Sequence, residues 1–233
     1  MSVAEQSTAY NPAADAGSPT ALGSFLQFVG VACNGFNLIA GESGRPVLNR
    51  AASLSDSWRV FFENIGLDDA PVEFLGKDIR ALLEDEAELK RALDEFNGVF
   101  HMPELPVPLW ESVWLSKEKI LFTEESFDVR AWYARFQWEI QRVGYEAEDH
   151  IGFEAAFCGW LFDAAANDGA PDHDGPQPTL EDVQDFLDQH FTRWAPECFR
   201  QLADVVKTPF WVHLLASAAV LSQALAEDIR QTA

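Results

Sequence analysis

Residues 151–166 read "IGFEAAFCGWLFDAAA", and apolar side chains in this run fall on nearly every face of a helix. A surface helix keeps one polar face for the solvent, so a helix that is apolar all round is buried on all sides. The run ends at "NDGAPDHDGPQP", residues 167–178, where glycines and prolines predict a loop. The stretch therefore predicts a helix in the interior of the fold.

Helical periodicity continues on the N-terminal side of this run. Two apolar stripes between residues 75 and 100 predict two helices separated by an acidic turn. Residues 126–143 predict one long helix, with Ser126 as its N-cap and Gly144 as its end.

On the C-terminal side, Thr179 and Asp182 have the spacing of a capping box that starts another helix. The most apolar segment, "PFWVHLLASAAVLSQAL" at residues 209–225, is shorter than the roughly 20 residues of a membrane-spanning helix. We therefore expect a core helix there and no membrane insertion. Because no alternating strand pattern occurs outside residues 107–115, we predict an all-α fold, a helical bundle of roughly ten helices.

The chain divides into a polar start and one long helical region. Residues 1–20 are rich in alanine, serine and proline and lack the basic and apolar regions of a secretory signal, so they predict a disordered tail. Residues 21–233 predict a single all-helical domain. It has a soft internal boundary near residues 101–125, where a proline-rich crossing joins an N-terminal and a C-terminal helical half.

The charge balance favours basic partners. Acidic residues outnumber basic ones by 38 to 16, which gives a formal net charge of -22. Such a chain repels nucleic acid and anionic membranes on average and attracts cationic peptides. A need for solubility, or a high-salt cytoplasm, would favour the same acidity.

No motif for catalysis or for metal binding stands out. Cys33, Cys158 and Cys198 lack C-x-x-C spacing and indicate neither a disulfide framework nor a zinc site, which favours the reducing cytoplasm. The sequence contains no G-x-S-x-G nucleophile motif, no H-E-x-x-H zinc motif and no glycine-rich phosphate loop. We predict no catalytic residue, no metal ligand and no cofactor. An enzyme that uses Asp149 and His150 is an alternative, although neighbouring residues on a helix do not face each other.

The proline-bracketed stretch "VPLWESVWL", residues 107–115, holds two tryptophans four residues apart. If its backbone is strand-like, Trp110 and Trp114 project from the same side and form a broad aromatic surface. The structural alternative is that both rings fill the seam between the two helical halves.

An acidic corner follows in "YEAEDHIGFE", residues 145–154, where Glu146, Glu148 and Asp149 precede His150. Carboxylates that face the solvent bind guanidinium groups through charge-assisted hydrogen bonds. The structural alternative is that Asp149 is the N-cap of the buried helix.

Four segments together carry a resemblance to a known family. They are "EFNGVFHMPELPVPLWESVWL" at 95–115, "ILF" at 120–122, the acidic corner, and "FLDQHFTRWAPECF" at 186–199. In this order they resemble the TorD/DmsD family of cytoplasmic chaperones for molybdenum-containing oxidoreductases. The resemblance covers about residues 70 to 225.

The resemblance implies an all-helical protein that binds the twin-arginine leader peptide and the apo form of its client enzyme, as a monomer or a swapped dimer. It implies that the client is held back from export until the molybdenum cofactor is inserted. The peptide-binding residues carried over by similarity are Trp110, Trp114, Asp149, His150, Phe96, Val99 and Phe100. Glu146 and Glu148 are added because of their charge.

The chain departs from the family pattern at Leu109, Glu104 and Thr123, which leaves the choice of client open. A non-exported client of the nitrate reductase type is one alternative. A helical adaptor that binds no leader peptide is another.

Overall fold

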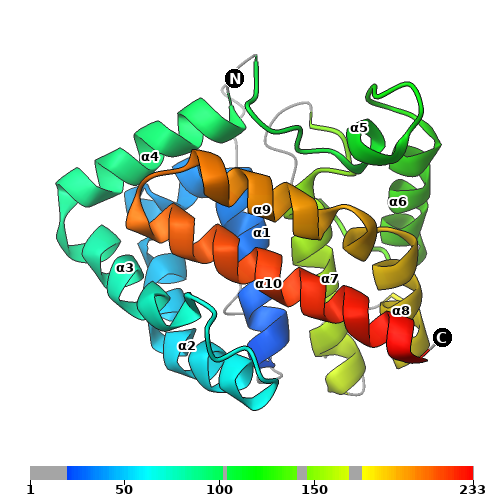
Figure 1. The fold of residues 1–233 in the computed structure, drawn as a ribbon, viewed down its shortest axis with the longest axis horizontal. Helices are drawn as coiled ribbons and strands as arrows, with labels where there is room; N and C mark the ends of the chain where they lie inside the picture. Colours follow the sequence, from blue (N-terminus) through cyan, green and yellow to red (C-terminus); the bar gives the residue numbers. More distant parts are fainter. Residues whose placement is uncertain (1–19, 102–103, 141–145, 168–174, 233) are drawn as a thin grey trace, which may run out of the picture.

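The computed structural model describes residues 20–101, 104–140, 146–167 and 175–232. In these ranges the chain forms ten α-helices, two 3-10 helices and no strand beyond a single β-bridge (Figure 1). The elements are α1 Ala21–Ile39, η1 Glu42–Gly44, α2 Arg45–Asn64, α3 Val72–Glu84, α4 Glu86–Phe100, α5 Glu111–Leu115, α6 Glu124–Arg135, α7 Ile151–Ala166, α8 Leu180–Gln189, η2 Phe191–Arg193, α9 Ala195–Val205 and α10 Pro209–Thr232. The prediction of an all-α bundle of roughly ten helices is confirmed.

The predicted tail at residues 1–20 lies outside the described residues except for Thr20, the N-cap of α1. The single domain over residues 21–233, with a soft boundary near residues 101–125, stays a prediction.

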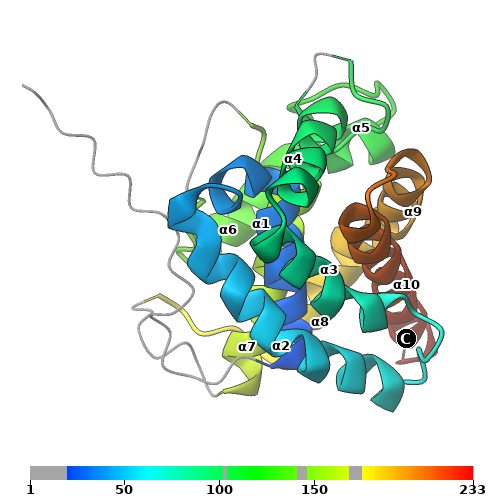
Figure 2. The ribbon, with the colours of Figure 1, turned by 90° about the vertical axis from the view of Figure 1, so that its left-hand side faces the viewer.

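The helices are arranged as packed pairs. α1 packs along α7, α9 packs along α10, and α2 packs along α3. Figure 1 shows the α9–α10 pair crossing in front of α1 and α7, and Figure 2 shows the same pair on one side of them. The core therefore lies between the two layers.

α7 is the interior helix that the sequence predicts. Ten of its residues are buried, and it approaches α1 closely because both helices carry glycines at their contact. A Cβ atom on Gly30 would lie 2.5 Å from the carbonyl oxygen of Gly152, and one on Gly159 would lie 2.5 Å from that of Gly23. Real Cβ atoms do not approach so closely, so these glycines permit the close crossing of α1 and α7.

The predicted helix over residues 126–143 is wrong at both ends. α6 starts after Thr123 rather than at Ser126, and it ends at Arg135. Gln137 then adopts a positive φ of 53°, and the rings of Phe136 and Trp138 both pack on Phe157. Tertiary packing of these rings on α7 thus ends the helix early. The predicted terminator, Gly144, lies outside the described residues.

The C-terminal helices follow the sequence more closely. Thr179 and Asp182 form the predicted capping box at the start of α8. The segment at residues 209–225 lies in a core helix, as expected, and this helix, α10, continues to Thr232 for a length of 24 residues.

Two helices have the length and apolar composition of a membrane span, namely Ala21–Ile39 and Pro209–Asp228. Buried residues make up 67% of the first window and 50% of the second. A core helix passes the same test, so these two helices are weak evidence for a span, and the absence of membrane insertion stays a prediction.

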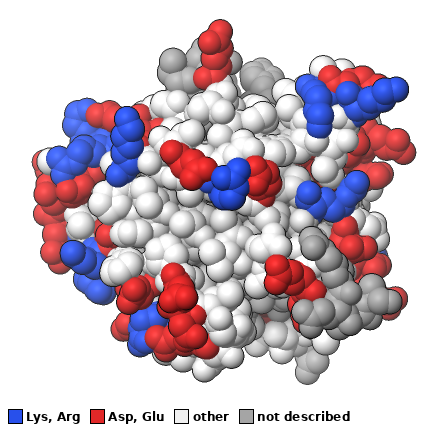
Figure 3. All heavy atoms as spheres, in the orientation of Figure 1, with Lys and Arg blue, Asp and Glu red and all other residues white. Residues whose placement is uncertain are grey.

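Acidic side chains lie at several places on the face that Figure 3 shows. On the face formed by α9 and α10, acidic side chains gather around the rim, and much of the middle is uncharged (Figure 3). The negative charge on this face is therefore not collected in one patch.

Candidate functional site

The proline-rich crossing is held against the start of α7. The amide of Ile151 donates to the carbonyl oxygen of Leu109 at 2.8 Å, and the amide of Glu111 donates to that of Asp149 at 2.9 Å. These bonds flank a β-bridge between Trp110 and His150. The backbone thereby places Trp110 beside Glu148, Asp149 and His150, here called the E-D-H motif, although 39 residues separate Trp110 from His150 in the sequence.

The expectation of an extended stretch over residues 107–115 is wrong in part. Trp110 has an extended backbone, with φ -124° and ψ 134°, but it is the N-cap of the short helix α5. Trp114 lies in that helix, so the two rings do not share one face of a strand. Trp114 donates its indole N–H to the carbonyl oxygen of Pro108 at 2.8 Å, and its ring centroid lies 6.5 Å from that of Trp194.

Asp149 does not face the solvent. Its side chain is fully buried, and its Oδ2 accepts a hydrogen bond from the amide of Ser112 at 2.8 Å, in the first turn of α5. The alternative that Asp149 caps α7 is also wrong. His150 is the N-cap of α7, because its Nδ1 accepts from the amide of Gly152 at 3.1 Å. The E-D-H motif therefore caps two helices with two consecutive side chains.

His150 is held in its neutral form. Burial, and secondarily the charge of nearby His101, lowers the pKa of His150 to about 3. A neutral ring with Nδ1 as acceptor is what the cap requires.

Glu148 is buried as well. Its Oε2 accepts from Arg130 at 2.9 Å, and its backbone oxygen accepts from the Tyr133 hydroxyl at 3.1 Å. The prediction of solvent-facing carboxylates is thus wrong for Glu148 and Asp149. Glu146 is only partly buried and is the member of the corner that reaches an open surface.

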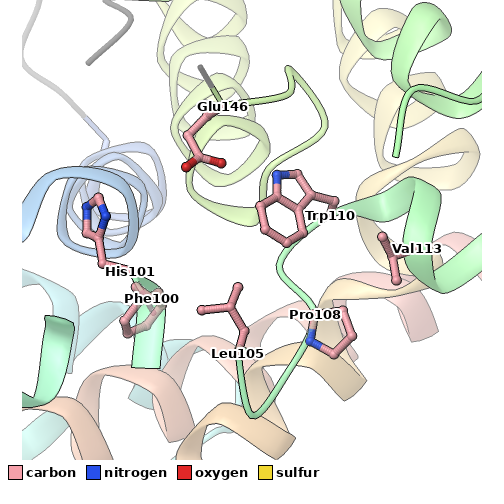
Figure 4. A pocket seen from close by; sticks show the side chains of 7 residues that line it. All are labelled: Phe100, His101, Leu105, Pro108, Trp110, Val113 and Glu146. Carbon is pink, nitrogen blue, oxygen red and sulfur yellow. The ribbon is translucent and has the colours of Figure 1, made fainter. Parts of the chain in front are cut away.

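That surface is a hollow of about 270 Å³ between the end of α4, the crossing and the segment before α7 (Figure 4). Apolar side chains form most of its wall, with one carboxylate and one imidazole among them. The lining residues are Phe100, His101, Leu105, Pro108, Trp110, Val113 and Glu146. The hollow therefore combines an apolar surface with a negative charge.

The structure brings three of the nine predicted residues to this hollow: Phe100, Trp110 and Glu146. Phe96 and Val99 are buried, and the Phe96 ring stacks on Phe100 at 5.4 Å between centroids, so it supports the wall from behind. Trp114, Glu148, Asp149 and His150 are outside the lining, and they hold the crossing in place through the contacts above.

Sequence reasoning missed His101, Leu105, Pro108 and Val113 in the lining. Val113 lies one turn along α5 from Trp110, but this spacing has meaning only once the crossing is known to turn into a helix. His101 directly follows the apolar stripe that ends at Phe100. Its place at the end of this stripe was a signal that could have identified it.

Beneath the crossing lies a set of buried polar side chains, here called the polar layer: Glu111, Asp149, Glu154, His190 and Trp194. Glu111 pairs with Nδ1 of His190 at 3.0 Å, and Glu154 accepts from the Trp194 indole N–H at 3.1 Å. One oxygen each of Asp149 and Glu154 has no hydrogen-bond partner among the described residues.

Burial sets the protonation of this layer. It raises the pKa of Glu111, although the contact with His190 opposes the shift. Burial and the neighbouring charges of Glu111 and Asp149 raise the pKa of Glu154 well above its usual range. Three carboxyl groups in one buried region favour a protonated Glu154.

The described residues contain no group of three or more His, Cys, Asp or Glu side chains arranged to hold a metal ion. The predicted absence of a metal and of a cofactor stays a prediction.

A family model described as "Nitrate reductase delta subunit" matches residues 67–200. The chain belongs to this family. The match extends from the loop before α3 into α9, and it includes every residue that lines the hollow. The membership predicted from the four sequence segments, in the TorD/DmsD family, is confirmed.

Curated relatives agree with this membership. The chain is 29% identical over 136 residues to the "Probable Tat proofreading chaperone DmsD" of Haemophilus influenzae, which covers 58% of this chain and 60% of that protein. It is 39% identical over 109 residues to the "Tat proofreading chaperone DmsD" of Salmonella typhimurium, or 46% of each chain. The chain thus spans about half the length of the curated relatives it matches. Their names describe chaperones and not enzymes, in agreement with the prediction of a non-enzymatic protein.

Proposed function

We propose that this protein is a cytoplasmic assembly chaperone for a molybdenum-containing oxidoreductase. It binds the twin-arginine leader peptide and the apo form of the client, and it holds the client for cofactor insertion before export. It performs no covalent chemistry of its own. The curated relatives support the leader-peptide part of this proposal, because their names refer to Tat proofreading.

The observation that carries the proposal is the composition of the hollow. A twin-arginine leader joins two guanidinium groups to an apolar stretch, so its receptor needs a carboxylate beside an apolar surface. The hollow has the Glu146 carboxylate next to the Trp110 ring, with Phe100 and Leu105 across from them (Figure 4). A guanidinium group can pair with the carboxylate and also lie against the indole face.

The nine predicted residues take two different roles in this proposal. Phe100, Trp110 and Glu146 contact the peptide. The other six position these three: Asp149 and His150 fix the crossing, Glu148 and Trp114 hold its flanks, and Phe96 and Val99 back the apolar wall.

A client of the nitrate reductase type is a second candidate, since the description of the family favours it. Such a client has no export step, and its N-terminal segment needs no pair of arginines. The same hollow would then bind an apolar segment with a single basic residue.

Calorimetric titration tests the proposal. The probe is a synthetic twin-arginine leader from a molybdenum-containing oxidoreductase encoded beside this protein, and the matched peptide has lysine at both arginine positions. We expect the arginine peptide to bind at least about tenfold more tightly, because lysine lacks the bidentate geometry of arginine. Equal affinities would contradict a twin-arginine site.

Two protein variants locate the binding. Glu146→Gln removes the carboxylate of the hollow, and Glu181→Gln removes an exposed carboxylate from α8 as the matched control. Only Glu146→Gln should weaken binding of the arginine peptide. If a nitrate reductase N-terminal peptide binds and both leader peptides fail, the second candidate replaces the first. If none of the peptides binds, the helical adaptor remains.

A further inference from the structure

His101 stands at the rim of the hollow, directly after α4. It is the C-cap of that helix, its side chain is exposed, and its ring lies edge-on to Phe96 with 5.2 Å between centroids. Figure 4 draws the Glu146 carboxylate between His101 and Trp110. An imidazole, the kind of side chain that serves as a pH switch in proteins, therefore lines the surface at which a cationic ligand would bind.

Negative groups lie around His101. The C-terminal end of a helix carries partial negative charge, and His101 lies at that end of α4. Glu146 adds a carboxylate in the same hollow, and Glu104 is exposed in the crossing. The other histidine that acts on His101 is His150, which is buried and neutral. His101 is thus the imidazole that lines the hollow.

We propose that His101 and Glu146 form a proton-dependent gate. When His101 is protonated, its positive charge offsets the negative charge of Glu146, with which the guanidinium group of a peptide would otherwise pair. This inference rests on the proposed function of the same hollow and adds its regulation. A peptide with an arginine side chain binds when His101 is neutral.

The sign of the effect follows from linkage. An imidazolium and a guanidinium beside one carboxylate repel each other, so a bound peptide disfavours the protonated ring. By reciprocity, protonation of the ring disfavours the peptide. Affinity is therefore full above the pH range in which the imidazole titrates, and it falls as the pH is lowered through that range. Binding inside the range releases protons.

The first test is a titration of the twin-arginine leader at about pH 8 and about pH 5.5, which bracket the range in which histidine changes charge. We expect wild-type affinity to be about threefold to tenfold lower at the acidic pH. His101→Gln should bring the ratio of the two affinities close to one. His213→Gln, which alters a histidine paired with Asp78 on the α3–α10 contact, should keep the wild-type ratio. A wild-type ratio near one, or an unchanged ratio in His101→Gln, would overturn the gate.

The second test does not depend on the leader. The imidazole signal of His101 is followed by NMR as a function of pH in the wild type and in Glu146→Gln, with and without arginine amide. The gate predicts that Glu146→Gln lowers the titration midpoint of His101, and that arginine amide lowers it in the wild type. Midpoints that do not move in either case would refute the gate. Midpoints that move as expected, together with no binding of any leader, would refute the proposed function and leave the gate standing for another cationic ligand.

Discussion

The hollow and the polar layer below it use the same kind of side chain in opposite ways. Glu146 lines an open surface, whereas Asp149, three residues later, is fully buried and caps α5. Trp110 and Trp114 differ in the same manner, since one lines the hollow and the other packs near Trp194. The comparison teaches that residues only a few positions apart in an acidic and aromatic motif can line an open surface and hold that surface in place.

If the polar layer is the support, its loss should affect stability most. His190→Ala removes the partner of Glu111 and leaves a buried carboxyl group unpaired, so we expect a loss of about 3 kcal/mol in the free energy of unfolding. Urea denaturation measures this loss. His213→Ala breaks a more exposed pair with Asp78 and should cost clearly less. If both variants lose a similar free energy of unfolding, the polar layer does not stabilise the fold more than an ordinary ion pair does.

The dependence of stability on pH sharpens the same comparison. The folded-state pKa of Glu154 is raised by burial, so its contribution to stability is fully present below the pKa of the unfolded chain and is lost as the pH rises through the folded value. Relative to the wild type, Glu154→Gln should gain stability with rising pH above about 5, by up to about 1.4 kcal/mol for each pH unit. Denaturation curves at several pH values check this. Glu181→Gln, on the surface, should show no such trend. If the difference in the free energy of unfolding between Glu154→Gln and the wild type does not change with pH, Glu154 is not a buried, protonated carboxyl group.

The link between support and surface is tested at Asp149. Asp149→Ala removes the cap of α5 and should cost about 1 kcal/mol of stability. It should also weaken binding of the leader peptide, because Trp110 is no longer held in its position. Since Asp149 is buried and does not meet the ligand, this loss of affinity should be the same at low and at high salt. A loss that disappears at high salt would place Asp149 in direct contact with the peptide.

The smallest effect is expected at the surface itself. Glu146→Gln should leave the melting temperature unchanged. It should lower the affinity for the leader peptide by about threefold to tenfold at low ionic strength. At about 0.5 M salt most of the difference should vanish, because an exposed charge is screened. Calorimetry at two salt concentrations measures both values. Equal losses at both concentrations would mean that Glu146 is not an exposed charge in the complex.

Local patterns in the sequence predicted a large part of the fold. The apolar run at residues 151–166 and the capping box at Thr179 depend on neighbours within one or two turns, and both are confirmed. The end of α6 was missed, because it depends on Phe157, about twenty residues further along the chain.

The candidate site shows the same limit. The sequence identified its motifs but not which side chains face outward, since the Asp149 contact with Ser112 spans 37 residues. The polar layer was missed for the same reason. A single glutamate inside the otherwise apolar start of α7, Glu154, was the signal that could have revealed it, because a buried acid needs a partner.

The most direct test of the account is an NMR map of the leader peptide on the isotope-labelled protein. If the hollow is the binding surface, the largest shifts on peptide addition will occur at Phe100, Val113, Glu146 and the Trp110 indole, with weaker shifts in the polar layer. If the largest shifts instead fall on the exposed apolar residues Ile120, Phe122 and Phe127, which lie outside the hollow, the account is contradicted.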